Sequence, residues 1–228
     1  ASARVDTLWV RSTSMDKTIG TIIITPTEYE QNNELYPAVY ILHGAGGDHG
    51  NWLRRMPELE ELSNEFGFVF VCPDGEKTSW YLDSPLDSSM KYETYIIDEL
   101  VPEIDSNYRI NKKAITGLSM GGHGALYLSL KNPEVFSIAG SMSGGVDLRP
   151  FPGNWDLPKR LGNQEENMIN WVENSVVVIA NSTDPTPFQF IVDCGTEDFF
   201  LEVNRGLNMV LKANGYDYHY SERKGAHN

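Results

Sequence analysis

The stretch Ala114-Ile115-Thr116-Gly117-Leu118-Ser119-Met120-Gly121-Gly122 decides the fold of this 228-residue chain. Its first residues, 114–117, have the pattern of a short strand, and the segment after Ser119 predicts a helix that continues to about Leu130. The spacing Gly-x-Ser-x-Gly is typical of a nucleophile elbow, in which a sharp turn between strand and helix exposes the serine. Such a turn is strained and needs small neighbours, which the flanking glycines supply. The alternative is a glycine-rich turn that carries an ordinary surface serine.

Strand-like and helix-like segments alternate on both sides of this elbow. We expect strands at 5–10, 19–25, 38–42, 68–72, 114–117, 137–141, 188–192 and 216–221, and helices at 52–66, 90–108 and 201–214. Pro102 should kink or divide the helix at 90–108. The apolar run at 176–180 is also of strand length. This alternation predicts an α/β fold, with a mostly parallel central sheet flanked by helices on both faces.

The length fits one domain that spans residues 1–228. One segment, 144–174, departs from the alternation and is rich in Pro, Gly, Asn and Trp. A long irregular segment in a compact domain is usually functional or disordered. Its aromatic residues Phe151, Trp155 and Trp171 favour an ordered insertion that walls the active site.

The charge balance limits the classes of partner. The chain carries 18 Lys and Arg against 32 Asp and Glu, a net charge of −14. Nucleic acids and anionic membranes attract basic surfaces, and no apolar run approaches the roughly 20 residues that cross a bilayer. We therefore expect neither nucleic acid nor membrane as a partner. The chain opens on Ala1 without a signal-peptide pattern, and we expect a secreted or periplasmic protein, with a cytoplasmic one as the alternative.

Two cysteines, Cys72 and Cys194, lie at the ends of expected strands, where buried free thiols are the ordinary case. They form no disulfide framework and cannot make a metal site by themselves. The sequence also contains no H-E-x-x-H motif, no Cys/His cluster and no P-loop. We expect no metal and no cofactor.

A serine nucleophile needs a base, and the chain has five histidines. After an elbow of this kind the triad follows the order Ser, then Asp or Glu, then His, which leaves His219 and His227. His219 falls within an alternating strand, where a side chain faces solvent or packs. His227 follows the last strand in a loop and could reach Ser119, so we take His227 as the base. The alternative is a disordered terminal histidine, because only Asn228 comes after it.

The carboxylate that orients this base should follow a strand between the two. Three acids, Asp193, Glu197 and Asp198, come directly after the expected strand at 188–192. Asp193 still belongs to the strand end, and Glu197 is one residue away from the loop tip. Asp198 lies at the tip and precedes two phenylalanines that could bury it. We favour Asp198 as the orienting acid.

An oxyanion hole needs two backbone N–H donors. One should come from the residue after the nucleophile, Met120, and the other from the glycine-rich loop 43–47 that follows the third strand. Ala45 is the first choice there, with Gly46 as the alternative. We interpret His43, at the start of the loop, as a structural hydrogen-bonding residue.

Three aromatic residues follow the third and fourth strands. Trp52, Trp80 and Tyr81 lie in segments after these strands, at the edge of an open α/β sheet where ligands bind. Large rings at this edge leave room for a short acyl chain and offer a flat surface to a sugar or an aromatic alcohol. The alternative is that these are ordinary core or surface residues.

Several motifs together resemble one family. They are Leu42-His43-Gly44, Asn51-Trp52, Ser79-Trp80-Tyr81, Gly117-Leu118-Ser119-Met120-Gly121-Gly122, Cys194-Gly195-Thr196-Glu197-Asp198-Phe199 and Gly225-Ala226-His227. This set is similar to the esterase D-like group of α/β-hydrolases, which includes tributyrin, acetyl-xylan and feruloyl esterases, S-formylglutathione hydrolases and mycolyltransferases. The likeness is greatest to the tributyrin and acetyl esterase branch.

The resemblance implies an α/β-hydrolase fold and a role for each matching position. Ser119 would be the nucleophile, Asp198 the acid and His227 the base, with Ala45 and Met120 as oxyanion donors. Relatives usually continue past the catalytic histidine with a Trp and a closing helix, whereas the present sequence stops at Asn228. We therefore expect this helix to be absent.

These observations favour a serine carboxylesterase for short-chain esters, acetyl to butyryl, on a small-molecule, saccharide or plant-wall substrate. An acyltransferase with the same triad is one alternative, since a sugar or lipid hydroxyl would then replace water. A non-catalytic carbohydrate-binding relative is another, although a binding module has no need of all three triad residues.

Overall fold

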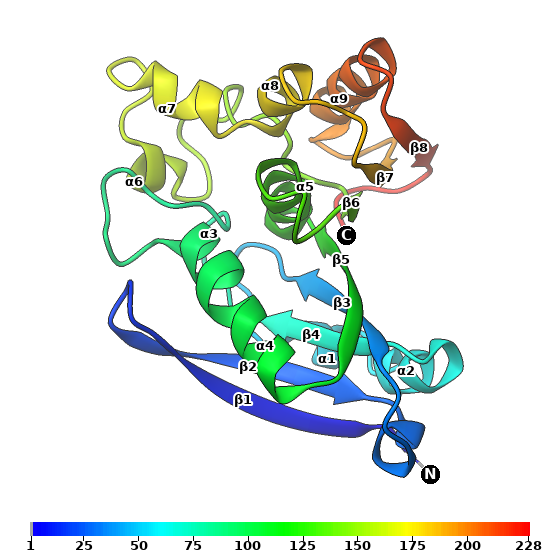
Figure 1. The fold of residues 1–228 in the computed structure, drawn as a ribbon. Coiled ribbons are helices and arrows are strands. Elements are labelled where there is room, and N and C mark those ends of the chain that lie inside the picture. The colour runs from blue at the N-terminus through cyan, green and yellow to red at the C-terminus, as the bar shows by residue number, and fades with distance from the viewer. Residues whose placement is uncertain (1) are drawn as a thin grey trace.

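The computed structural model describes residues 2–228 and contains one eight-stranded sheet (Figure 1). The strand order is β1-β2-β4-β3-β5-β6-β7-β8, with β1 and β8 at opposite edges. The strands are β1 (Arg4–Ser12), β2 (Lys17–Thr25), β3 (Tyr36–Leu42), β4 (Val69–Pro73), β5 (Ile110–Leu118), β6 (Ile138–Met142), β7 (Gln189–Gly195) and β8 (Asp217–Arg223). The first two strands pair antiparallel to each other, and β2 pairs antiparallel to β4; every later pairing is parallel. The predicted α/β fold with a mostly parallel sheet is confirmed.

Helices fill the connections between these strands. They are η1 (Thr27–Gln31), α1 (Asn51–Arg55), α2 (Leu59–Phe66), α3 (Tyr92–Thr94), η2 (Tyr95–Leu100), α4 (Val101–Asn107), α5 (Met120–Lys131), α6 (Leu157–Leu161), α7 (Met168–Glu173), α8 (Val176–Asn181) and α9 (Leu201–Ala213). Within residues 2–228, every helix is too short or too polar to cross a bilayer.

Two hydrophobic cores cover the two faces of the sheet. Successive side chains of a strand point to opposite faces, and in β4 both sets are buried. In β4, Val69 and Val71 belong to the large core under α5, whereas Phe70 joins a smaller core with Trp52 and Leu59 of α1 and α2. Burial on both faces explains why β4 is continuously apolar and not alternating.

One part of the second face is open to solvent. Ile138 on β6 and Ile191 on β7 are 44% and 61% exposed, and both line an apolar hollow of about 290 Å³. The neighbouring Ala139 and Val192 point the other way and are buried in the large core. Alternation along the strands therefore separates a buried and an open face at this end of the sheet.

The structure corrects two predicted elements. The helix expected at 52–66 is two helices, because Met56 has a non-helical backbone (φ −137°, ψ 73°) and Pro57 follows it. The apolar run at 176–180, which has strand length, is the helix α8 and packs against α5 and α9. In a short apolar run, periodicity alone cannot distinguish a buried strand from a buried helix.

The helix expected at 90–108 is one uninterrupted helical run, in which α3, η2 and α4 follow each other without a gap. Pro102, which was expected to kink or divide it, lies in the first turn of α4 directly after the π-helical segment η2, so the helix changes its hydrogen-bond pattern there and is not divided. Cys72 and Cys194 are buried free thiols. The segment 144–174 is more regular than expected, because α6 and α7 lie within it.

Candidate active site

The turn between β5 and α5 holds Ser119 in a strained conformation. Its backbone angles are φ 62° and ψ −116°, which few residues other than glycine adopt. The helix packs very close behind it. A Cβ atom on Gly117 would lie 2.2 Å from the carbonyl oxygen of Gly121, and one on Gly121 would lie 2.2 Å from the carbonyl oxygen of Leu42. Both glycines are required because α5 lies directly against β3 and β5.

Ser119, His227 and Asp198 form one continuous chain of hydrogen bonds. The Ser119 Oγ lies 2.7 Å from Nε2 of His227, and Nδ1 of His227 lies 2.9 Å from Oδ2 of Asp198. An ionised carboxylate only accepts hydrogen bonds, so Nδ1 carries the ring proton and Nε2 accepts from the serine hydroxyl. In this arrangement the imidazole can take the proton of Ser119 when the serine attacks.

The Asp198 carboxylate is completely buried and firmly held. Its second oxygen, Oδ1, accepts the backbone N–H of Phe200 at 2.8 Å. The loop around it is tied to the histidine loop, because the Glu197 N–H donates to the Gly225 carbonyl at 2.8 Å. These bonds set the acid and the base at a fixed separation.

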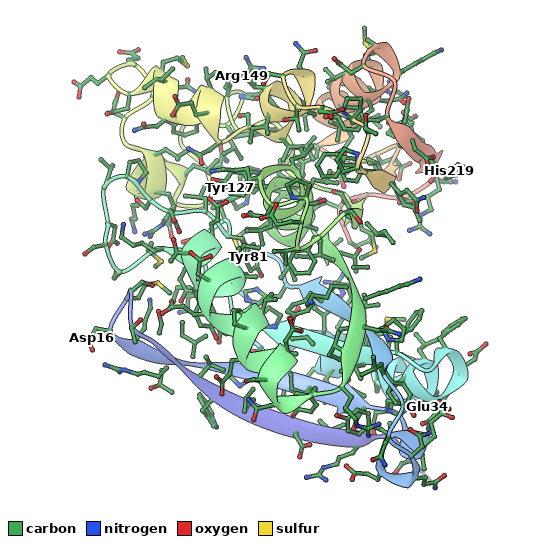
Figure 2. All side chains as sticks on the ribbon, viewed as in Figure 1. Asp16, Glu34, Tyr81, Tyr127, Arg149 and His219 are labelled. Carbon is green, nitrogen blue, oxygen red and sulfur yellow. The ribbon has the colours of Figure 1, made fainter. Side chains whose placement is uncertain are left out.

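The competing acids and the competing histidine lie elsewhere. Asp193 accepts hydrogen bonds from Ser221 Oγ and Arg223 Nε, both at 3.1 Å, and so holds the strand ends together. Glu197 is exposed. His219 is exposed on β8, at the outer edge of the molecule in Figure 2.

The loop after β3 is arranged so that one backbone N–H stays free. The Gly46 N–H donates to the Lys77 carbonyl at 2.8 Å, and the Gly47 N–H donates to the Gly44 carbonyl at 3.1 Å. Among residues 2–228, the Ala45 N–H has no acceptor, and Ala45 lines the same cleft as Ser119. Met120 supplies the first N–H of α5, which has no carbonyl within the helix to bond. These two N–H groups are the ones that the sequence predicts as donors of the oxyanion hole.

His43 is the anchor of that loop. Its Nδ1–H donates to the Gly44 carbonyl at 2.7 Å, and its Nε2 accepts the Gly75 N–H at 2.9 Å. This pair of bonds requires the neutral ring, and burial lowers the pKa of His43 accordingly. Tyr81 Oη adds a hydrogen bond of 2.8 Å to the His43 carbonyl. The structural interpretation of His43 agrees with these contacts.

A cleft of about 440 Å³ opens above Ser119. Its apolar walls are Trp155, from the segment 144–174, and Phe199, which follows the acid; their rings stack 5.6 Å apart. Phe199 also contacts the His227 ring, at 4.3 Å between centroids. The complete lining is Gly44, Ala45, Gly46, Gly47, Asn51, Arg55, Leu118, Ser119, Trp155, Phe199, His227 and Asn228.

The aromatic residues expected in this lining require correction. Trp80 and Tyr81 are 1% and 0% exposed and lie behind the cleft, with Tyr81 in the middle of the molecule in Figure 2. Trp52 is also mostly buried; its Nε1–H donates to the Leu42 carbonyl, and it lines an adjoining hollow instead. Loops after parallel strands do reach the site, but these rings point toward the core, because burial of their apolar area stabilises the fold.

Trp80 acts on the cleft indirectly. Its Nε1–H donates to the Trp155 carbonyl at 3.1 Å, and Thr78 Oγ1 donates to Asp156 at 2.8 Å. Trp155 and Asp156 both have positive φ, as does Trp80. Strain of this kind persists only where the surroundings hold it in place. The two loops therefore support each other and keep Trp155 at the wall.

Several lining residues were not among the predicted contacts, including Asn51, Arg55, Phe199 and Asn228. Arg55 lies at the end of a helix with no motif to mark it, and only the structure reveals its place. Phe199 adjoins the acid in sequence, so its position in the chain was the available signal. Within residues 2–228, no group of three or more His, Cys, Asp or Glu side chains is placed to hold a metal ion.

Comparison with known proteins identifies the family of this chain. The model of the Esterase family matches residues 12–228. The chain belongs to this family. An acetyl esterase from Caldicellulosiruptor saccharolyticus is 26% identical to this chain over 212 residues, which cover 86% of this chain and 79% of that protein. Esterase Rv1288 from Mycobacterium tuberculosis is 32% identical over 137 residues.

The mycobacterial match covers 57% of this chain and 30% of Rv1288, so the chain spans less than a third of that relative's length. Among solved structures, a ferulic acid esterase superposes with a TM-score of 0.85 at 24% identity, over 99% of this chain and 91% of its own. An S-formylglutathione hydrolase from Agrobacterium tumefaciens gives 0.80 at 24% identity, over 99% and 89%. These two likenesses show that the fold is that of the α/β-hydrolases.

Proposed function

We propose that this esterase hydrolyses short-chain carboxylic esters through an acyl-enzyme on Ser119. The observation that carries the proposal is the hydrogen-bonded series Ser119, His227 and Asp198, with distances of 2.7 and 2.9 Å. These lie within the range over which a base accepts a proton from its nucleophile.

The reaction proceeds in two halves. Ser119 Oγ attacks the ester carbonyl carbon as its proton passes to Nε2 of His227, and the carbonyl oxygen becomes an oxyanion near the N–H groups of Ala45 and Met120. His227 then gives the proton to the departing alcohol. In the second half His227 removes a proton from water as the water oxygen attacks the acyl carbon. The bond from that carbon to Ser119 Oγ then breaks, the carboxylic acid leaves, and His227 returns the proton to Ser119 Oγ. Asp198 stays ionised and stabilises the imidazolium in both halves.

The size of the acyl group follows from the walls. Trp155 and Phe199 are large rings beside Ser119, and the segment 144–174 supplies the first of them. Such walls suit acetyl to butyryl groups and can stack against a sugar or an aromatic alcohol. The names of the relatives, acetyl esterase and ferulic acid esterase, are consistent with a saccharide or plant-wall ester as substrate.

Substitution of the nucleophile tests the proposal. Ser119→Ala should lower kcat for p-nitrophenyl acetate by at least about 10³-fold, because triad members act as a unit. Circular dichroism should show the same fold for both proteins. Free acetate should be the product in water, whereas an acetylated acceptor alcohol would indicate an acyltransferase. An unchanged hydrolysis rate in the variant would overturn the proposal.

A further inference from the structure

The catalytic cleft carries positive charge although the molecule is strongly acidic. The net charge is −14, yet the side chains that line the cleft and the adjoining hollow include Arg55, Arg223 and Lys224. One acid, Asp193, lines the hollow as well. The local balance is therefore positive where the overall balance is negative.

Arg55 is the cation that both cavities share. It lines the cleft of Ser119 and the adjoining hollow, which also have Leu118 and Asn228 in common, so the two cavities lie side by side. A substrate seated at Ser119 therefore shares its cleft with the Arg55 side chain.

The guanidinium of Arg55 has no partner of its own. Arg223 is paired with Asp193 at 3.1 Å, and the adjacent Arg54 is paired with Asp48 at 2.8 Å. Within the described residues, no carboxylate lies within ion-pair distance of Arg55 or Lys224. An unpaired guanidinium that lines a binding cleft is available to a ligand, and its planar fork suits a carboxylate.

We propose that Arg55 selects esters that carry a carboxylate in addition to the scissile bond. This inference rests on the proposed esterase function and names the charge class of its substrate. The positive charge would also attract an anionic substrate toward a protein whose net charge otherwise repels it.

Two matched pairs of esters test the proposal on each side of the scissile bond. Monomethyl succinate against methyl butyrate places the carboxylate on the acyl side. 4-Acetoxybenzoate against phenyl acetate places it on the alcohol side. For each pair the quantity measured is the ratio of kcat/KM, anionic over neutral, in the wild type, in Arg55→Gln and in Arg54→Gln.

Arg55→Gln should lower this ratio roughly 5- to 30-fold in at least one pair, and added salt should lower the wild-type ratio in the same pair. The pair that responds identifies the side that faces Arg55. Arg54→Gln removes the same charge from the neighbouring position, outside the cleft, and should keep the wild-type ratio. Equal ratios in Arg55→Gln and wild type for both pairs would overturn the proposal. Failure of the esterase function itself would look different, since no ester of either pair would then react.

Discussion

The hydroxyl of Tyr81 donates a hydrogen bond of 2.8 Å to the backbone carbonyl of His43. Tyr81 is completely buried and has a φ of 56°, so its position is held by the surrounding core. The bond fixes the first peptide of the loop that carries the free N–H of Ala45. A residue expected to touch the substrate is thus placed to shape the oxyanion loop from behind.

Removal of this bond should reduce catalysis and leave substrate binding largely intact. Tyr81→Phe deprives the His43 carbonyl of its donor and lets the loop shift. We expect kcat for p-nitrophenyl acetate to fall about tenfold with little change in KM, less than the loss of an oxyanion donor itself. Tyr40→Phe is the matched control, because Tyr40 is equally buried and its hydroxyl has no partner among residues 2–228. Equal kcat values for the two variants would contradict a role for Tyr81 in positioning the loop.

Three acids, Asp193 within β7 and Glu197 and Asp198 after it, should differ sharply in their effect on catalysis. Asp198→Asn keeps the acceptor for the Phe200 N–H but no longer favours the proton on Nδ1 of His227, so kcat should fall by about 10³ to 10⁴. Asp193→Asn and Glu197→Gln should each cost less than about tenfold, because neither side chain contacts His227. Single-turnover rates with p-nitrophenyl acetate make the comparison. If Asp193→Asn were the inactive variant, Asp193 and not Asp198 would be the orienting acid.

The order of strands and helices was predictable, because it depends on local patterns. The buried strands are apolar throughout, and Gly67 ends α2 in the left-handed conformation that favours glycine. The sequence predictions were wrong where tertiary packing determines whether a segment forms a strand or a helix. The run at 176–180 has no periodicity that separates a strand from a helix, and its burial under α5 and α9 makes it helical.

The site, like the fold, has one part that the sequence predicts and another that depends on tertiary packing. Ser119, Asp198 and His227 follow from motif and chain order, and the structure brings these three together. The direction of Trp52, Trp80 and Tyr81 could not be predicted, because an aromatic ring after a strand can turn either toward the cleft or toward the core. The burial of Trp80 and Tyr81 depends on their positive φ, which no sequence pattern predicts.

Stability should fall in acid because of a buried histidine behind the elbow. His123 is completely buried between Trp80 and Tyr127, and burial lowers its pKa to about 3. The unfolded chain takes up this proton below about pH 6.5, whereas the native state does not until about pH 3. Each pH unit within that window should therefore remove about 1.4 kcal/mol of unfolding free energy.

Urea unfolding between pH 7 and pH 4 measures this slope. His123→Phe keeps an aromatic ring between its neighbours and removes the titrating group, so its stability should depend less on pH than that of the wild type. The difference between the two curves should grow as the pH falls. Parallel curves for the two proteins would show that His123 does not titrate differently on folding.

The acyl group should be limited by Trp155 and Phe199. Both rings line the cleft, and Trp155 is held there by the bond from Trp80 to its carbonyl. We expect kcat/KM for p-nitrophenyl esters from C2 to C12 to be greatest at C2 to C4. Trp155→Ala opens the wall and should raise the ratio of C8 to C2 about tenfold, because each methylene group that gains a place contributes to binding.

A tryptophan outside the cleft separates this effect from a general loss of packing. Trp9 is 62% exposed on β1 and does not line the cleft, so Trp9→Ala should keep the wild-type profile. Trp80→Ala should act in the same direction as Trp155→Ala, because it frees the wall residue, but it should also lower thermal stability since Trp80 is buried. A wild-type maximum at C10 or longer would contradict the short-acyl preference, and an unchanged profile in Trp155→Ala would remove Trp155 from the acyl wall.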